Sequence, residues 1–430
     1  MRINSKKNQN KSNIFTLSWL WVLLVLLSVF NSAHALTIET CQEKAKANYP
    51  LINQFGLIEQ TADYTISNAN KGYLPQLSLS AKGTYQSDAI SITIGAMQMN
   101  QDKDQYQAVL EANQLIWDGG IISAQKKITK AGSEVEKQKL EVDLFNLNER
   151  VNQLFFGILL LDEQIKQTGI LQEELEVNYK RLVAFKQNGV ANQSDLDAIK
   201  VEQINADQHK IELESTQKAY KIMLGALMGM PVKDDVLEKP EMDLAILNDT
   251  TNNRPELKLF DAQKNLFESQ KSLLNAGNLP KLGLFGQAGY GKPGLNMLSN
   301  SFSDFYIGGI RLSWNFSGLY TQKNNINKLE VNKKSVDIQK ETFLFNTDLK
   351  TKQQQTEIEK LQNVLTNDDE IIRLRENIKK ASNAKLDNGT LTVPDLIRDI
   401  NAENQAKQTK SLHEIQLLMT VYQLKNNINQ

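Results

Sequence analysis

Few side chains in this sequence could carry acid-base, nucleophilic or metal chemistry. The 430 residues include a single cysteine, Cys41, and three histidines: His34, His209 and His413. One cysteine forms no internal disulfide, and so few histidines disfavour a Cys/His metal site or a thiol–histidine catalytic pair. The carboxylates of Asp195 and Asp197 are better explained by capping at a helix start than by acid-base catalysis. We therefore expect no enzyme, no cofactor and no metal.

The glycines and the charges exclude two further classes of function. Gly283, Gly286, Gly289 and Gly291 alternate within or beside an expected strand, whereas a phosphate-binding loop opens a helix. The 49 Lys and Arg residues balance the 50 Asp and Glu residues, and no basic run occurs. Nucleic-acid-binding proteins normally show a basic excess. We expect neither nucleotide-driven chemistry nor nucleic-acid binding.

Two short segments share the same turn and capping residues. Asn-Gly is followed by Asp-Leu at the same spacing in both: Asn188, Gly189, Asp195 and Leu196, then Asn388, Gly389, Asp395 and Leu396. Glycine at such a position ends a helix in the left-handed conformation, and the aspartate that follows suits the start of the next helix. Each segment therefore predicts a tight tip between two antiparallel helices.

These tips belong to a tandem repeat. Leu74-Pro75 recurs as Leu279-Pro280, and Trp117 and Trp314 end matching apolar alternations. Several landmarks in the same order at nearly one spacing predict two repeats, 36–230 and 250–430, joined by a linker at 231–249.

Each repeat is expected to run helix, two strands, very long helix, helix. The seam Leu140, Leu144, Leu147 and Val151 has the spacing of a coiled coil. Ser194 with Asp197, and Thr392 with Asp395, resemble helix-start caps. The expected long and returning helices are about 120–188 and 194–228 in the first repeat, and about 320–387 and 394–427 in the second.

Four segments alternate apolar and polar residues with period two. They lie at about 76–87, 106–117, 281–291 and 303–316, with aromatic residues near their ends: Tyr73, Trp117, Trp314 and Tyr320. Such segments fit membrane barrel strands, and they also fit a soluble sheet with one buried face. Four strands cannot close a barrel that spans a bilayer, so a membrane barrel would need other copies of the chain. Two copies would supply 8 strands and three would supply 12, and geometry alone does not choose.

The first 35 residues have the layout of a secretory signal peptide. A basic stretch precedes the apolar run 14–30, and Ala33 and Ala35 occupy the small-residue positions before a cleavage site. The run is also near the length of a membrane span, so an uncleaved anchor is the alternative.

Together these features resemble the TolC family of outer-membrane efflux proteins. The resemblance is carried by the signal peptide, the tandem repeat, the mature start at Leu36, the sequence Asn-Arg-Pro-Glu-Leu at 253–257, Trp-Asp-Gly-Gly at 117–120 and the two tips. It implies a mainly α protomer of a homotrimer, with an α-helical barrel in the periplasm below a 12-strand outer-membrane β-barrel, four strands per chain. It also implies a passive exit duct for efflux or type I secretion, with a periplasmic adaptor protein and an inner-membrane pump as partners.

The resemblance assigns roles to residues at the tips. Asn188, Gly189, Asn388 and Gly389 would lie where the adaptor docks. Asp395 is similar to an acidic residue that narrows the family's periplasmic aperture, although capping explains it equally well. Another acidic position of that ring falls at Arg398, with Asp399 and Asp387 nearby. The alternatives are a periplasmic adaptor, which should have one hairpin flanked by β-rich domains, and a coiled-coil structural protein of the envelope, which would lack the strand segments.

Overall fold

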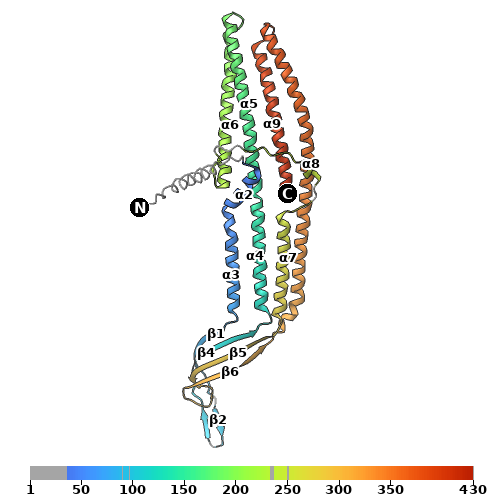
Figure 1. Cartoon of the computed structure of the whole chain (residues 1–430). Coiled ribbons are helices and arrows are strands. Elements are labelled where there is room, and N and C mark those ends of the chain that lie inside the picture. The colour runs from blue at the N-terminus through green and yellow to red at the C-terminus, as the bar shows by residue number, and fades with distance from the viewer. Residues whose placement is uncertain (1–35, 90, 96, 233–236, 249–250, 430) are drawn as a thin grey trace, which may run out of the picture. The chain divides into compact units, whose positions relative to one another are not determined.

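The computed structural model describes residues 36–89, 91–95, 97–232, 237–248 and 251–429 (Figure 1). The expected signal peptide lies outside these residues. The first repeat contains α2 (Ile38–Asn48), a 3-10 turn (Pro50–Asn53), α3 (Gln54–Lys71), β1 (Gln76–Tyr85), β2 (Ser91–Ile94), β3 (Met97–Asn100), β4 (Asp104–Trp117), α4 (Ile121–Phe145), α5 (Leu147–Gln187) and α6 (Gln193–Met228). A second 3-10 turn (Leu244–Asn248) precedes α7 (Pro255–Gly277), β5 (Lys281–Lys292), β6 (Ser303–Ser313), α8 (Ser317–Asp387) and α9 (Val393–Ile428). The expected mainly α fold with four strands in one sheet is confirmed.

The chain divides into two compact units that do not coincide with the two repeats. The hairpin unit takes in Met1–Tyr49, Leu147–Asp249 and Gln354–Asn426, and the sheet unit takes in Pro50–Asn146, Thr250–Gln353 and Asn427–Gln430. Each unit therefore combines equivalent elements of both repeats.

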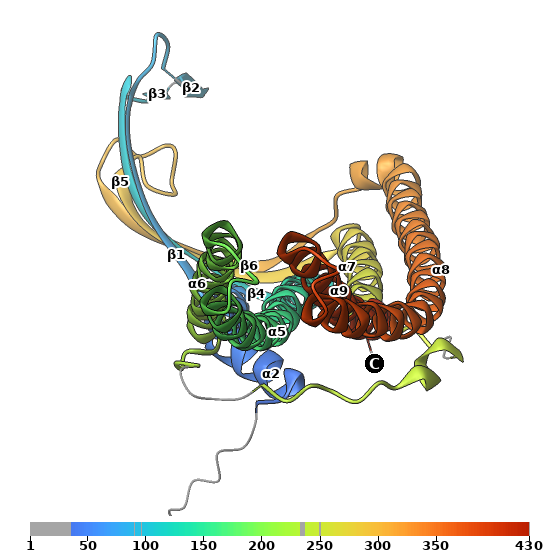
Figure 2. The same ribbon diagram turned by 90° about the horizontal axis from the view of Figure 1, so that it is seen from above.

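The main sheet of the sheet unit is antiparallel, with the order β1-β4-β5-β6, and it is curved (Figure 2). Strands β4 and β5 come from different repeats, so their pairing joins the two repeats within one sheet. One row of the register runs through Leu79, Leu110, Ala288 and Tyr306. The register shifts between Leu115 and Trp117, and this irregularity places Trp117 opposite Leu282.

A small hairpin of β2 and β3 follows β1 and was missed by the sequence analysis. Its two strands have four residues each, too few for an alternation to stand out.

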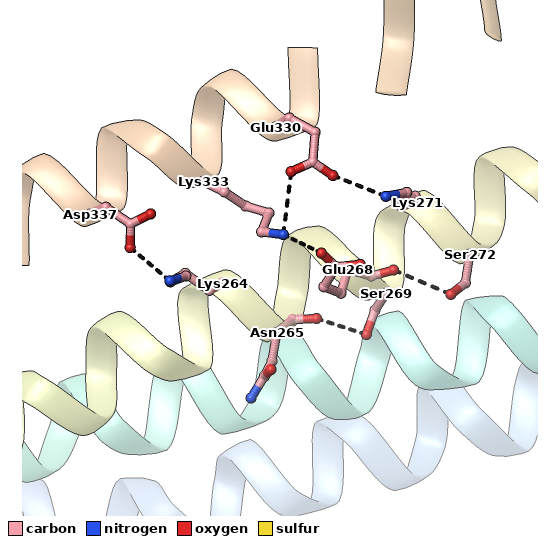
Figure 3. Close-up of polar contacts among 9 residues, drawn as sticks. All are labelled: Lys264, Asn265, Glu268, Ser269, Lys271, Ser272, Glu330, Lys333 and Asp337. Carbon is pink, nitrogen blue, oxygen red and sulfur yellow. Dashed lines mark hydrogen bonds and ion pairs between the residues drawn. The ribbon is translucent and has the colours of Figure 1, made fainter. Parts of the chain in front are cut away.

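Helices α3, α4, α7 and the first part of α8 belong to the sheet unit. Helix α4 packs on α3 and α7. An alternating set of ion pairs joins α7 to α8, and we call this set the charge ladder (Figure 3). Its four ion pairs are Asp261 with Lys340 (3.1 Å), Lys264 with Asp337 (2.7 Å), Glu268 with Lys333, and Lys271 with Glu330 (3.0 Å). Figure 3 shows the last three of them.

The hairpin unit has two apolar cores. The first packs α2 and α5 against the ends of α6 and α9, around Phe155, Phe156 and Tyr422. The second lies close to the tips and contains buried side chains of four helices: Leu175 and Leu182 of α5, Leu196 and Ile199 of α6, Leu386 of α8, and Leu396 and Ile400 of α9. The two helical hairpins are therefore one packed body at this end.

The single helix expected over about 120–188 is interrupted, so that expectation was wrong at Asn146. Helix α4 ends at Phe145 and α5 begins at Leu147, and Asn146 has φ −63° and ψ −17°. Asparagine is a weak helix former, and the interruption falls where the chain passes from one unit into the other. Its counterpart α8 runs 71 residues without a break.

In the part of the chain that the structure describes, no helix combines the length and apolar character needed to cross a membrane.

Candidate functional site: hairpin tips and an apolar sheet face

The two tips have the same backbone hydrogen bonds. Gly189 (φ +73°) and Gly389 (φ +68°) are left-handed, and both close a Schellman motif. In the first tip the N–H of Gly189 bonds to Lys186 O (3.0 Å) and that of Val190 to Phe185 O (2.9 Å). In the second, Gly389 bonds to Leu386 O (3.0 Å) and Thr390 to Lys385 O (2.9 Å). Backbone N–H groups thus bond to carbonyls in the last turn of each helix.

The asparagine before each glycine has the same role in both tips. Asn188 Nδ2 donates to Ala184 O (3.0 Å), and Asn388 Nδ2 donates to Ala384 O (2.8 Å). Each side chain therefore satisfies a carbonyl in the last helical turn. A β-carbon on Gly189 or Gly389 would meet no atom within 4 Å, so space does not require glycine. Glycine is required because φ is positive at these two positions.

The returning helices start with side-chain caps. Asn192 Oδ1 accepts from Asp195 N (3.1 Å), and Asp195 Oδ2 accepts from Asn192 N (3.0 Å), which makes a reciprocal capping box. The cap expected at Ser194 with Asp197 was therefore wrong by two residues, because Asn192 is the better-placed acceptor. In the second repeat Thr392 Oγ1 accepts from Asp395 N (3.3 Å), where the sequence placed it.

The candidate aperture residues on α9 all have local partners. Asp395 pairs with Arg398 (3.0 Å) and accepts from the Thr392 hydroxyl (2.6 Å). Asp399 accepts from Ser382 Oγ on α8 (2.6 Å). Arg398 keeps a side chain that is 70% exposed. An acidic group at Asp395 is thus partly neutralised one turn away, and its role in an aperture stays a prediction.

A polar link between the two hairpins was missed by the sequence analysis. Arg181 of α5 donates from Nη1 to Asn383 Oδ1 (2.9 Å) and from Nη2 to Asn383 O (3.0 Å), and it forms an ion pair with Asp387 of α8. Burial lowers the pKa of Arg181, yet a guanidinium stays protonated at physiological pH. This fork joins the first repeat to the second immediately below the second tip.

A buried carboxylate reinforces the same helices. Glu403 of α9 is 3% exposed and pairs with Lys379 and with Lys407 (2.6 Å), while Lys379 also reaches Glu174 of α5 (2.8 Å). Burial would raise the pKa of Glu403, but the hydrogen bonds and charges of the two lysines outweigh it and lower that pKa. Burial would likewise lower the pKa of Lys379, but Glu174 and Glu403 raise it. The cluster is therefore ionised across the neutral range.

One face of the four-stranded sheet is apolar and exposed. Leu79 is 76% exposed and Ile310 is 72% exposed, although both are large aliphatic side chains. The other exposed apolar side chains of this face are Leu77, Leu110, Leu284 and Leu312. A soluble monomer rarely exposes so large a contiguous apolar patch, which normally marks an interaction surface. We call this surface the apolar sheet face.

Two groups of aromatic side chains bound the apolar sheet face. Near the β2–β3 end, Phe302 stacks on Tyr290 (5.5 Å) and Tyr106 (6.3 Å), with Tyr85 and Tyr306 also exposed. Near the helices, Trp314 packs on Phe316 (4.7 Å), with Tyr73, Trp117 and Tyr320 also exposed. Tyr306 of β6 and Trp314, the residue after the end of β6, lie eight residues apart, which is about 27 Å along a strand.

The sequence of residues 42–230 matches the family model described as outer membrane efflux protein. The structure agrees with that match. VceC from Vibrio cholerae has 12% identical residues and a TM-score of 0.65, with 91% of this chain and 95% of VceC covered. The CmeC outer membrane channel of Campylobacter jejuni has 13% identity and a TM-score of 0.62, with 91% and 85% covered.

The match to the family model covers less than half of the 430 residues, and over that segment the chain is similar to the outer membrane efflux proteins. The MtrE outer membrane channel of Neisseria gonorrhoeae, whose structure is an open state, has 13% identity and a TM-score of 0.61, with 91% of this chain and 88% of MtrE covered. The comparison with curated proteins found no match. At these identities the structural likeness concerns the fold.

Proposed function

We propose that this protein is the outer-membrane exit duct of a tripartite efflux or type I secretion system, and that three copies form the duct. The apolar sheet face is the observation that carries the proposal. It presents aliphatic side chains between two aromatic groups about 27 Å apart along the strand direction, close to the roughly 25 Å apolar band of outer-membrane barrels. Tyr and Trp are the residues enriched at membrane interfaces.

The open edges of the sheet support assembly with identical copies. In the described part of the chain, β1 and β6 pair on one side only, and each leaves a row of backbone N–H and C=O groups without a strand partner. Such edges are not viable in lipid, so β6 of one copy would pair with β1 of the next. Four strands from each of three copies give 12.

The helices beside these strands also carry exposed apolar side chains. Val331, Ile338 and Phe345 recur every seven residues on α8 and are exposed, as are Leu57 and Tyr64 on α3. A seven-residue apolar repeat is the seam of a coiled coil that lacks its partner. Contact of α8 with α3 of the next copy would close a ring by rotation, which is a heterologous interface.

The hairpin tips would form the periplasmic end, where an adaptor protein docks and an inner-membrane pump supplies the energy. Passive conduction needs no reacting group in the duct itself. Gating would be a two-state repacking of the α8–α9 hairpin against α5 and α6, opposed by the Arg181 fork and the Glu403 cluster. Arg398, Asp395 and Asp399 would lie near the resulting aperture.

Fractionation and conductance together test this proposal. The protein should be recovered from detergent-solubilised outer membranes as a trimer whose gel mobility changes on heating. It should also form water-filled channels in planar lipid bilayers. Recovery as a monomer from the soluble periplasmic fraction would contradict the duct and favour an adaptor or an envelope coiled-coil protein.

A further inference from the structure

The face of the sheet opposite the apolar sheet face carries two phenylalanines among polar residues. Phe285 pairs with Gly309 across β5 and β6, and Phe305 pairs with Gly289 across the same two strands. A β-carbon on Gly309 would lie 3.0 Å from the Phe285 ring, and one on Gly289 would clash with the Phe305 ring. Each phenylalanine ring thus lies over a glycine. Because glycine has no β-carbon, the ring can occupy this position.

The Phe285 ring in turn contacts the Arg311 guanidinium. The guanidinium carbon lies 4.6 Å from the centre of the Phe285 ring, in cation–π geometry. Arg311 is opposite Gly283 in the register, two positions from Gly309 on the same face of β6. Gly309, Phe285 and Arg311 therefore fix a cation on the polar face, and no carboxylate among the described residues forms an ion pair with it.

Arg311 borders a hollow of about 350 Å³ at the end of the sheet nearest the helices. Lys281, Gln76, Asn113 and Ser313 share the lining. None of the described residues that line it is acidic, and within the described chain neither Lys281 nor Arg311 forms an ion pair. The one carboxylate nearby in the register, Glu111, accepts a hydrogen bond from Asn113 Nδ2 (2.9 Å).

We propose that this hollow is an anion-binding site, at which Arg311 and Lys281 hold carboxylate or phosphate groups of the solutes that pass through the duct. An arginine fork suits planar, multivalent anions, and the amide and hydroxyl groups of Asn113, Gln76 and Ser313 add neutral donors. The inference rests on the proposed function, since only in a closed barrel does the polar face line a passage. Three copies would then present a ring of six cations, and such rings select anions in pores.

Citrate block of the conductance tests the site. The purified full-length protein would be reconstituted in planar bilayers, and citrate would be added on the β2–β3 side while the single-channel current is recorded. We expect the citrate concentration that halves the current to rise about threefold to tenfold in the double variant Arg311→Gln/Lys281→Gln. The control is Lys82→Gln, which removes a cation from the same face further along β1 and should leave this concentration unchanged.

The positioning role of Phe285 is tested by Phe285→Leu. This variant keeps both cations and should weaken citrate block while the current without citrate stays the same. Equal citrate block in the wild type and the double variant would overturn the anion site, and equal block in Phe285→Leu would overturn the positioning role. If the wild-type protein forms no channel at all, the duct proposal is what fails. Trimer mobility on a gel confirms that each variant has assembled.

Discussion

Arg181 and Asp387 form an ion pair although they are 206 residues apart in the sequence. The first lies on α5, in the first repeat, and the second is the last residue of α8, in the second repeat. Together with the bonds to Asn383, this pair connects the two hairpins close to their tips. Loss of the fork should therefore favour any state in which the hairpins separate.

We predict that Arg181→Gln raises the time-averaged conductance of planar bilayers that contain the protein. Removal of a charge-assisted fork costs about 1.5 to 3 kcal/mol, which would raise the ratio of open to closed channels roughly tenfold or more. The control is Lys180→Gln, because Lys180 is exposed and its ion pair among the described residues lies within its own helix, with Glu176 (3.2 Å). Equal conductance in the two variants would show that the fork does not hold the hairpins together.

Gly389→Ala should impair adaptor-dependent export while the trimer remains assembled. Alanine at φ +68° costs about 1 kcal/mol, and the strain falls on a tip that must fit between adaptor helices. Gly169→Ala is the matched control, because a β-carbon there also meets no atom within 4 Å and its φ is not positive. Normal export by Gly389→Ala, measured with the adaptor and pump present, would contradict the assignment of this tip to the adaptor-docking surface.

The Glu403 cluster predicts a pH dependence of stability. Because the pKa of Glu403 is lowered from 4.5, its contribution is present above pH 4.5 and is lost as the pH falls through the folded-state pKa. The raised pKa of Lys379 means that the lysine's contribution is present below pH 10.5 and is lost as the pH rises through the folded-state pKa.

Glu403→Gln should therefore lower the free energy of unfolding by about 2 kcal/mol at neutral pH. The difference from the wild type should shrink as the pH is lowered below 4.5. Thermal unfolding across that range measures it. Glu376→Gln removes the more exposed partner of Lys407 and should have a much smaller effect. A constant difference between Glu403→Gln and the wild type at all pH values would mean that the carboxylate is not ionised in the folded protein.

Ile310→Lys should prevent stable insertion of the barrel. Ile310 lies midway between Tyr306 and Trp314 on the apolar sheet face, where a lysine costs about 2 to 4 kcal/mol in lipid. Ile307→Lys is a control on the same strand, because Ile307 belongs to the opposite face. The yield of folded trimer after refolding into lipid vesicles is the measurement. If Ile307→Lys were the more damaging of the two, the assignment of the two faces would be reversed.

Local patterns in the sequence predicted most of the elements. The period-two segments located the four strands of the main sheet, and the Asn-Gly steps located both tips, because these signals depend on neighbouring residues. Two features could not be predicted: the link from Arg181 to Asp387, and the lysines around Glu403. Both join different helices, and local sequence patterns do not give the rotation of one helix relative to another about its axis. The interruption at Asn146 was missed because the apolar seam of Leu144 and Leu147 continues across it.

The charge ladder between α7 and α8 has a consequence for register. From Asp261 to Lys271 the signs on α7 alternate, and each faces its opposite on α8. If α8 slid by one rung, Asp261 would face Asp337, Lys264 would face Lys333 and Glu268 would face Glu330. Every remaining pair would then repel. The alternating charges thus fix the alignment of α7 with α8, because a shifted alignment would be destabilised by repulsion. This does not depend on the shape of an apolar seam.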